Sequence, residues 1–275
     1  MPEEVFFRTM LFKFFNKIET WEAIERGIGP VEYSSVDLDQ ISTLLEGRRS
    51  KGIPIYSAAY IMPSPKFGFA RKHDNHLALL AKMMDDRLPN RIRQKRSLRD
   101  VYLSLLDYSG LGSFLAFQFA VDLNYSTLID FAEESFVVAG PGAIDGISKC
   151  IERTDSQTPE DIIYDLFENQ RCYFTDNSIE FQNLFGRPLM PIDCQNLLCE
   201  ISKYARVAHP DRKGLSGRTR IKQMYNPTGR HLDVPFFPPK WGINENVREH
   251  MAKLAESGNI SQLCQHGSLQ LLTTP

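Results

Sequence analysis

The chain has 275 residues, a formal net charge of −2, 42% hydrophobic residues and 24% charged residues. These values are ordinary for a soluble globular protein and exclude a disordered or collagen-like chain. The length allows one large domain or two small ones. Five cysteines at irregular spacings do not fit an iron–sulfur loop, so we expect buried free thiols, no cofactor and a cytoplasmic protein. We expect neither a signal peptide nor a membrane-spanning segment.

The N-terminal region is predicted to be helical. Residues 5–26 place apolar side chains near helical spacing, which predicts one amphipathic helix or two with a break. Residues 36–45 and 55–62 predict two further helices, separated by a polar, basic turn at 48–52.

His73 and His76 stand three residues apart, just before a helical run at 77–84. Such a pair can share a helix face and bind a metal ion, but no third ligand lies nearby in the sequence. We therefore predict no metal site and interpret the pair as a helix start, with histidines that are phosphate-facing or merely solvated.

The centre of the chain has the pattern of a helix-hairpin-helix. A helix expected at 98–108 leads into the turn Ser109-Gly110-Leu111-Gly112, and an apolar helical run follows at 114–121. Glycines allow a tight turn and leave backbone N–H groups accessible, and the N-terminus of the second helix favours a phosphate. The turn therefore predicts a contact with a DNA backbone.

Basic residues concentrate in two segments of this otherwise neutral chain. Residues 87–99 hold six Arg or Lys and no acid, and residues 203–230 hold eight against Asp211 alone. Such segments are typical of a DNA footprint on one face, and the alternative is a pair of solvated helix faces or loops.

The second half of the chain also predicts helices. The turn Gly140-Pro141-Gly142 leads into a helix that carries Asp145. Thr158-Pro159-Glu160-Asp161 is the expected N-cap and first turn of a helix that reaches about Gln170. Further helices are expected at 179–185, 193–204 and 246–255.

Four stretches resemble a known family: SGLGSFLAFQFAVDLNYS, FVVAGPGAIDGI, CQNLLCEISKYARVAHP and GRTRIKQMYNP. The family is labelled alpha-glutamyl/putrescinyl thymine pyrophosphorylase, or the helical domain associated with hydroxymethyldeoxyuridine DNA kinases. Its members are similar to helix-hairpin-helix DNA glycosylases and act on hypermodified bases in phage DNA. The resemblance implies an all-α, helix-hairpin-helix glycosylase-like domain at 1–230, as one body or as two lobes around a cleft, and a C-terminal extension with one helix at 231–275.

Some members resemble anti-phage glycosylases, which implies a monofunctional DNA glycosylase that excises a hypermodified base from double-stranded phage DNA. The first substrate candidate is alpha-glucosyl-hydroxymethylcytosine. An abasic site would remain, because a lyase needs a lysine just after the hairpin, where Ser113 stands. A carboxylate near C1′ would stabilise the transition state, with Asp145 as first candidate and Asp122 as second. Helix-hairpin-helix glycosylases keep this Asp at the helix start, where this chain has Ala139-Gly140, and the nearest acid is Asp145.

The resemblance also implies which residues meet the DNA. Asn16 would fill the gap left by a flipped base, and the alternative is that Asn16 caps a helix that restarts toward Trp21. The predicted DNA-binding residues are Gly110, Leu111, Gly112, Ser113, Asn16, Arg218, Arg220 and Lys222. The predicted base pocket consists of Gly140, Pro141, Gly142, Asn196, Glu200, Lys203 and Tyr204. An i,i+3 salt bridge between Glu200 and Lys203 is the alternative for those two residues.

Two other functions stay open at this point. The family label favours a transferase or pyrophosphorylase that modifies thymine bases in DNA, and a helical scaffold alone would serve as a DNA-binding module. The chain lacks a GxxxxGK[ST] phosphate-binding motif, so the kinase of the family name belongs to other, fused domains. We expect a monomer with no membrane partner.

Overall fold

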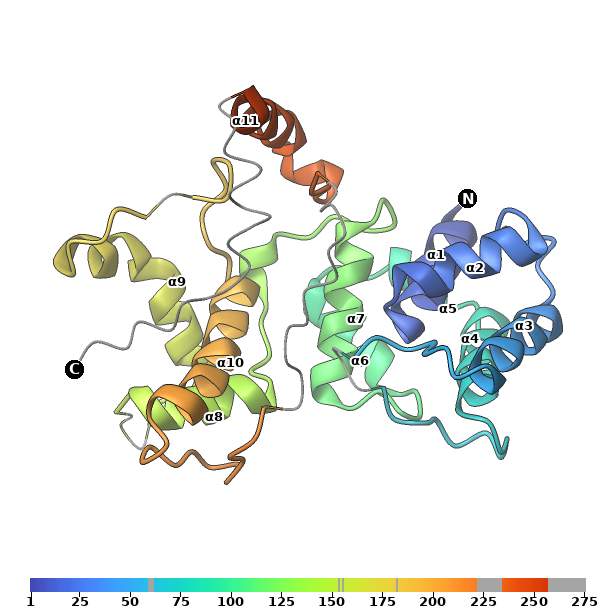
Figure 1. The fold of residues 1–275 in the computed structure, drawn as a ribbon, viewed down its shortest axis with the longest axis horizontal. Coiled ribbons are helices and arrows are strands. Elements are labelled where there is room, and N and C mark those ends of the chain that lie inside the picture. Colours follow the sequence, from blue (N-terminus) through green and yellow to red (C-terminus); the bar gives the residue numbers. More distant parts are fainter. Residues whose placement is uncertain (59–61, 153, 155, 182, 222–233, 257–275) are drawn as a thin grey trace. The chain divides into compact units, whose positions relative to one another are not determined.

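The computed structural model describes residues 1–58, 62–152, 154, 156–181, 183–221 and 234–256 (Figure 1). All regular elements in this part of the chain are helical, namely eleven α-helices and two 3-10 helices, and it contains no strand. The predicted all-α class is therefore confirmed. None of the described helices is long and apolar enough to cross a membrane.

The chain forms two compact units. The first consists of residues 1–170 and 190–221, and the second holds the remaining described residues. The helices of the first unit are α1 (Pro2–Phe15), α2 (Ile18–Ile28), α3 (Leu38–Ser50), α4 (Lys72–Asp85), α5 (Leu88–Arg93), α6 (Leu98–Leu106), α7 (Ser113–Tyr125), η1 (Glu133–Ser135), α8 (Pro141–Cys150), α9 (Pro159–Asp176) and α10 (Pro191–Ala208). The end of α9 belongs to the second unit, together with η2 (Pro239–Trp241) and α11 (Asn244–Glu256).

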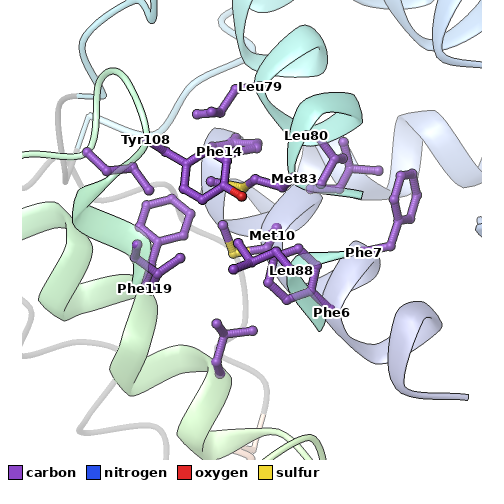
Figure 2. Packing of buried hydrophobic residues seen from close by; sticks show 14 of the residues in the cluster. Phe6, Phe7, Met10, Phe14, Leu79, Leu80, Met83, Leu88, Tyr108 and Phe119 are labelled. Atoms are coloured by element: carbon purple, nitrogen blue, oxygen red, sulfur yellow. The ribbon is translucent and has the colours of Figure 1, made fainter. Parts of the chain in front are cut away.

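The main hydrophobic core of the first unit lies around α1. The buried apolar residues of this helix are Phe6, Phe7, Met10, Leu11, Phe14 and Phe15. They cover about half of its circumference, which gives the helix a broad apolar face for its neighbours. α4, α5 and α7 pack against α1, and Figure 2 shows Leu80, Leu88 and Phe119 from these helices around the α1 side chains.

The predicted helix–turn–helix hairpin is present in the first unit. Ser97 caps α6, because its side chain accepts a hydrogen bond from the Asp100 backbone N–H at 3.1 Å. In the turn, Gly110 has a φ of 86°, which is strained for any other residue. A Cβ on this glycine would also stand 3.2 Å from Pro65. The turn therefore requires a glycine, and α7 then packs back against α6.

α8 and α10 lie side by side because glycines let their backbones approach (Figure 1). A Cβ on Gly146 would overlap the Leu198 carbonyl oxygen, and one on Gly142 would overlap Cys199 Sγ. The close contact of the two helices accounts for both glycines.

Residues 55–62, predicted as a helix, are irregular wherever they are described, and three of them lie outside the described part. The Ser57 N–H donates to the Phe15 carbonyl at 2.8 Å. Thr20 Oγ1 donates to the Ile55 carbonyl at 2.9 Å. The backbone of this segment thus bonds to other elements, and these bonds replace the helical ones that its sequence would allow.

Two helix boundaries differ from the prediction and one agrees. α3 continues to Ser50, so most of the expected turn at 48–52 is helical. α8 begins at Pro141, because proline is pre-organised for a first helical position. At the start of α9, Thr158 and Asp161 accept hydrogen bonds from each other's backbone N–H, which confirms the predicted cap.

The second unit is smaller and contains α11, which confirms the helix predicted at 246–255. The helix predicted at 179–185 is absent from its described residues. The Ile179 N–H instead bonds to the Phe174 carbonyl at 2.8 Å, and Phe181 stacks on the Phe174 ring. These contacts fold the segment back onto the end of α9.

Gly146→Ala should lower the free energy of unfolding, because the added methyl group would push α8 away from the Leu198 carbonyl. We expect a loss of about 1–3 kcal/mol, the usual cost of overpacking, measured by urea unfolding. Gly47→Ala in α3 is the matched control, since its Cβ would meet nothing within 4 Å, and it should gain about 0.5–1 kcal/mol. Unchanged stability of Gly146→Ala would contradict the close helix contact.

Candidate active site and DNA-binding surface

Asp145, the first candidate for a catalytic carboxylate, lies in a buried polar cluster between α8 and α10. Its Oδ2 accepts a hydrogen bond from Ser202 Oγ at 2.5 Å and lies 3.0 Å from Lys149 Nζ. Its Oδ1 accepts a hydrogen bond from the Ser216 backbone N–H at 2.8 Å. Lys149 follows Asp145 by one helical turn, so the i,i+4 spacing brings the two charges together. Both side chains are only 2% exposed.

Arg206 on α10 adds a second cation to this cluster. Its Nη2 lies 3.6 Å from Asp145 Oδ2 and donates to Ser202 Oγ at 3.1 Å. Its Nη1 donates to the Arg220 carbonyl at 3.2 Å, while its buried Nε has no hydrogen-bond partner. The cluster thus holds one carboxylate and two cations, together with an unused N–H donor that can bind an anion.

The cluster keeps Asp145 ionised. Burial opposes ionisation, but hydrogen bonds from Ser202, Ser216 and Lys149 outweigh it and hold the pKa of this carboxyl well below its usual value. A carboxylate that is ionised and shielded from water stabilises a nearby positive charge far better than one in solution.

The loop at 209–221 covers the carboxylate. Ser216 binds Asp145 through its N–H, and a Cβ on Gly214 would overlap Asp145 Oδ1. The Leu215 N–H donates to Ser148 Oγ at 3.2 Å, which ties the loop to α8. Both carboxylate oxygens of Asp145 therefore have partners within the protein.

Asp122, the second candidate, forms an ion pair of 2.8 Å with Lys13 of α1. Burial raises the pKa of the Asp122 carboxyl, and Lys13 opposes this rise. Lys13 is itself a buried lysine, and a buried charge needs a partner. The pair therefore explains why an acid stands near the end of the otherwise apolar α7.

The glycines of the predicted base pocket lie at the contact of α8 with its neighbours. The Gly140 N–H donates to Gln195 Oε1 at 3.1 Å, and a Cβ there would stand 2.6 Å from the Phe114 ring. Gly142 packs against α10, and Pro141 is exposed. Helix packing accounts for both glycines, and a contact of these residues with a base stays a prediction.

The polar residues of the predicted base pocket lie on the exposed side of α10. Glu200 and Lys203 form an ion pair of 2.5 Å, which confirms the expected i,i+3 salt bridge. Asn196 Oδ1 accepts a hydrogen bond from Gln195 Nε2 at 2.7 Å. Tyr204 is 63% exposed. The structure does not bring these residues to Asp145, and their contact with a base stays a prediction.

The predicted DNA contacts of the hairpin lie at the start of α7. Gly112 is the N-cap residue, no side chain caps the helix there, and Gly112 and Ser113 are exposed, whereas Leu111 is buried. The first N–H groups of a helix have no helical partners and favour a phosphate. Asn16 ends α1 in a left-handed conformation, with its N–H bonded to the Phe12 carbonyl. The N-cap residue of α2 is Lys17, so the interpretation of Asn16 as the cap of the second helix is wrong.

Most basic side chains of the first segment, residues 87–99, are exposed, and Lys95 is half-buried. The exposed ones are Arg87, Arg91, Arg93, Arg96 and Arg99. In the second segment Arg218 and Arg220 are exposed, and Lys222 lies outside the described residues. These cations are free to meet a polyanion.

The two histidines at the start of α4 are both buried, so the expectation of solvated side chains is wrong. His76 Nδ1 lies 2.8 Å from Tyr56 Oη and its Nε2 lies 2.9 Å from the Pro63 carbonyl. Burial lowers the pKa of His76 to about 4. His73 differs, because its Nε2 has no hydrogen-bond partner.

No group of three or more potential metal-binding side chains occurs among the described residues. The described cysteines are free, as predicted, but Cys150 and Cys172 are exposed and only Cys194 is fully buried. Cys264 lies outside the described part of the chain.

The partners of Asp145 were not predicted from the sequence. Lys149 was detectable, because an acid and a lysine four residues apart on a helix commonly pair. Ser202 and Arg206 also stand four residues apart and share a face of α10. Nothing in the local pattern shows that this face meets α8, apart from the glycines that allow the close approach.

The arrangement defines an all-helical protein with a helix hairpin and a buried, ion-paired carboxylate. Residues 1–214 match the family described as the helical domain of 5-hmdU DNA kinase. This match covers most of the chain, so the protein belongs to this family and the resemblance seen in the sequence is confirmed. No match to a curated protein or to a solved structure was found.

Asp145 should make the stability of the protein depend on pH in acid. Its folded-state pKa lies below the unfolded value of about 3.9, so its contribution is complete above that value and is lost as the pH falls below it. Asp145→Asn should be less stable by about 3–5 kcal/mol at neutral pH, because Lys149 keeps a buried, unpaired charge. The free energy of unfolding of this variant should then fall less than that of wild type as the pH drops below about 5.

Urea unfolding at neutral and acidic pH measures this difference. Asp211→Asn is the control, because it removes a carboxylate that is 77% exposed, and it should follow the wild-type profile. An Asp145→Asn variant with the same acid-side decline as wild type would show that the carboxylate is not held as the structure indicates.

Proposed function

We propose that this protein binds double-stranded DNA and hydrolyses the N-glycosidic bond of a modified base, with Asp145 as the catalytic carboxylate. The observation that carries this proposal is the buried, ionised Asp145 on a helix that begins directly after Gly140. The family description names 5-hmdU in DNA, which supports a 5-hydroxymethylated pyrimidine as the class of substrate. The first candidate is alpha-glucosyl-hydroxymethylcytosine in phage DNA, with a role in anti-phage defence.

The reaction breaks the bond between C1′ of the deoxyribose and the base nitrogen, and the electron pair leaves with the base. Positive charge develops on the sugar, and Asp145 stabilises it. A water molecule adds its oxygen to C1′ and loses a proton, while the leaving base gains one. The products are the free base and an abasic site in an intact strand.

Access to Asp145 requires the loop at 209–221 to move away from the carboxylate. Lys149 and Arg206 then stay beside it, and both are suited to bind the phosphates that flank the flipped nucleotide. The loop itself carries Arg218 and Arg220, so its displacement by DNA would exchange its hydrogen bonds to Asp145 and Ser148 for contacts with phosphates.

DNA binding outside the site is assigned to the hairpin and the first basic segment. The uncapped start of α7 at Gly112 and Ser113 offers backbone N–H groups to one phosphate. The exposed arginines of 87–99 lie in the segment before α6, the other helix of the hairpin, except for Arg99, which lies in its first turn. α6 spans about 14 Å, so the two sets of donors reach different phosphates of one duplex.

The family match supports a second function equally well. In it, the protein is a transferase or pyrophosphorylase that modifies thymine bases in DNA, or a non-catalytic DNA-binding module. The Asp145 cluster would then be a structural network that joins α8 to α10, and its closed geometry fits that role as well.

Excision is tested by alkali cleavage of DNA after incubation with the purified protein. Genomes with plain cytosine, hydroxymethylcytosine and glucosylated hydroxymethylcytosine are compared, because alkali converts abasic sites to strand breaks. We expect breaks in the glucosylated DNA, and a rate at least about a hundredfold lower for Asp145→Asn. Asp122→Asn should keep activity, since its carboxylate pairs with Lys13.

Circular dichroism shows whether each variant folds, and an Asp145→Asn, Lys149→Gln double variant avoids the unpaired lysine. Loss of activity in Asp122→Asn alone would reassign the catalytic carboxylate. Intact DNA in all three genomes, with DNA binding retained, would contradict excision and favour the second function, which mass analysis of thymine-modified DNA then tests.

The basic segment is tested by the salt dependence of DNA binding. Arg96→Gln and Arg99→Gln should each weaken binding for all sequences and reduce the slope of log K against log salt by about 1, the effect of one lost phosphate contact. Arg26→Gln is the control, because it removes an exposed arginine that pairs with Glu22 on α2. Unchanged slopes would place the DNA elsewhere on the protein.

A further inference from the structure

The loop at 62–71 lies against the turn of the hairpin. The Lys66 backbone N–H donates to Ser109 Oγ at 3.2 Å. On the other side of the turn, a Cβ on Gly110 would stand 3.2 Å from the Pro65 side chain. The loop carries two basic residues and no acid, so it adds positive charge next to the proposed phosphate donors. A duplex that binds the hairpin would therefore also lie near this loop.

Asn75, which is 3% exposed, fixes the backbone of this loop. Its Oδ1 accepts hydrogen bonds from the N–H groups of Phe67 and Phe69, at 3.1 Å and 3.2 Å. Its Nδ2 donates to the Phe69 carbonyl at 2.7 Å. Gly68, between the two phenylalanines, has a φ of 86°, which favours glycine. The two rings have different surroundings, since Phe67 packs against the core whereas Phe69 is 54% exposed.

Phe69 is the one exposed phenylalanine among the described residues of the first unit. Single exposed apolar side chains are common on protein surfaces, but both backbone groups of this residue are bound to a buried side chain. The ring is therefore held in solvent at a defined place beside the hairpin. A partner that covers it would gain the free energy of burying a phenyl ring.

The faces of DNA bases are such a partner, and they lie within reach. Lys66 and Phe69 are three residues apart, so their Cα atoms are separated by at most about 11 Å, the rise of about three base pairs. Phenylalanine inserts between base steps in DNA-bending proteins, and a base that is turned out leaves a gap in the stack. We infer that Phe69 enters the duplex at the flipped nucleotide and stacks in this gap.

This inference rests on the proposed DNA binding and base flipping, and it makes Phe69 a positioning residue for the proposed reaction. Asn16, the residue predicted for this role from the sequence, is half-buried at the end of α1. The phenyl ring offers a larger apolar surface than an amide for stacking on the neighbouring bases.

Binding of the full chain to two DNA duplexes tests the role of Phe69 without an excision assay. One duplex is fully paired, and the other carries a tetrahydrofuran abasic analogue, which leaves a gap at one position. Wild type should bind the gapped duplex at least about tenfold more tightly, because the ring stacks there without displacing a base. Phe69→Ala should lose this preference and keep its affinity for the paired duplex within about twofold of wild type. Phe69→Trp should retain the preference.

Tyr33→Ala is the matched control, because it removes a 38% exposed aromatic side chain between α2 and α3, and it should keep the preference. Circular dichroism shows that each variant folds. Equal affinities of wild type for the two duplexes, an unchanged preference in Phe69→Ala, or an equal loss in Tyr33→Ala would overturn the inference.

The same measurement separates this inference from the proposed function. A wild-type protein that binds neither duplex would contradict the proposed DNA binding as well as the role of Phe69. Absence of excision, together with a gap preference that Phe69→Ala abolishes, would contradict the proposed reaction alone and support the role of Phe69.

Discussion

The contact between α8 and α10 is the constraint on which the candidate active site depends. Gly142 and Gly146 bring the two backbones together, and only at this separation do Ser202 and Arg206 reach Asp145. A buried ion pair is stable only when hydrogen bonds satisfy its remaining donors and acceptors. A change that separates the helices therefore acts on the carboxylate as well as on the packing.

The loop at 209–221 gives this carboxylate a closed state. Ser216 supplies a backbone N–H to Asp145, and Gly214 leaves room for the loop to lie against it. These contacts are single hydrogen bonds to a loop, whereas the helix contact beneath them is built from packed side chains. The loop is therefore held less firmly than the helix contact beneath it.

Local charge matters more here than the net charge of −2. The Asp145 cluster holds two cations for one acid, and the segment 87–99 carries five exposed arginines and no acid. Such fields attract phosphates at defined places, although the protein as a whole is slightly acidic.

The sequence alone determined what depends on neighbours in the chain. Apolar spacing predicted the helical class, the glycine turn predicted the hairpin at 98–125, and Thr158 with Asp161 marked the start of α9, because turns and caps are local. The tertiary structure decided the rest. It replaced the helix predicted at 55–62 with hydrogen bonds to other elements, and it placed Ser202 against Asp145 from 57 residues away. A periodic pattern shows which residues share a helix face, but not which other face it will meet.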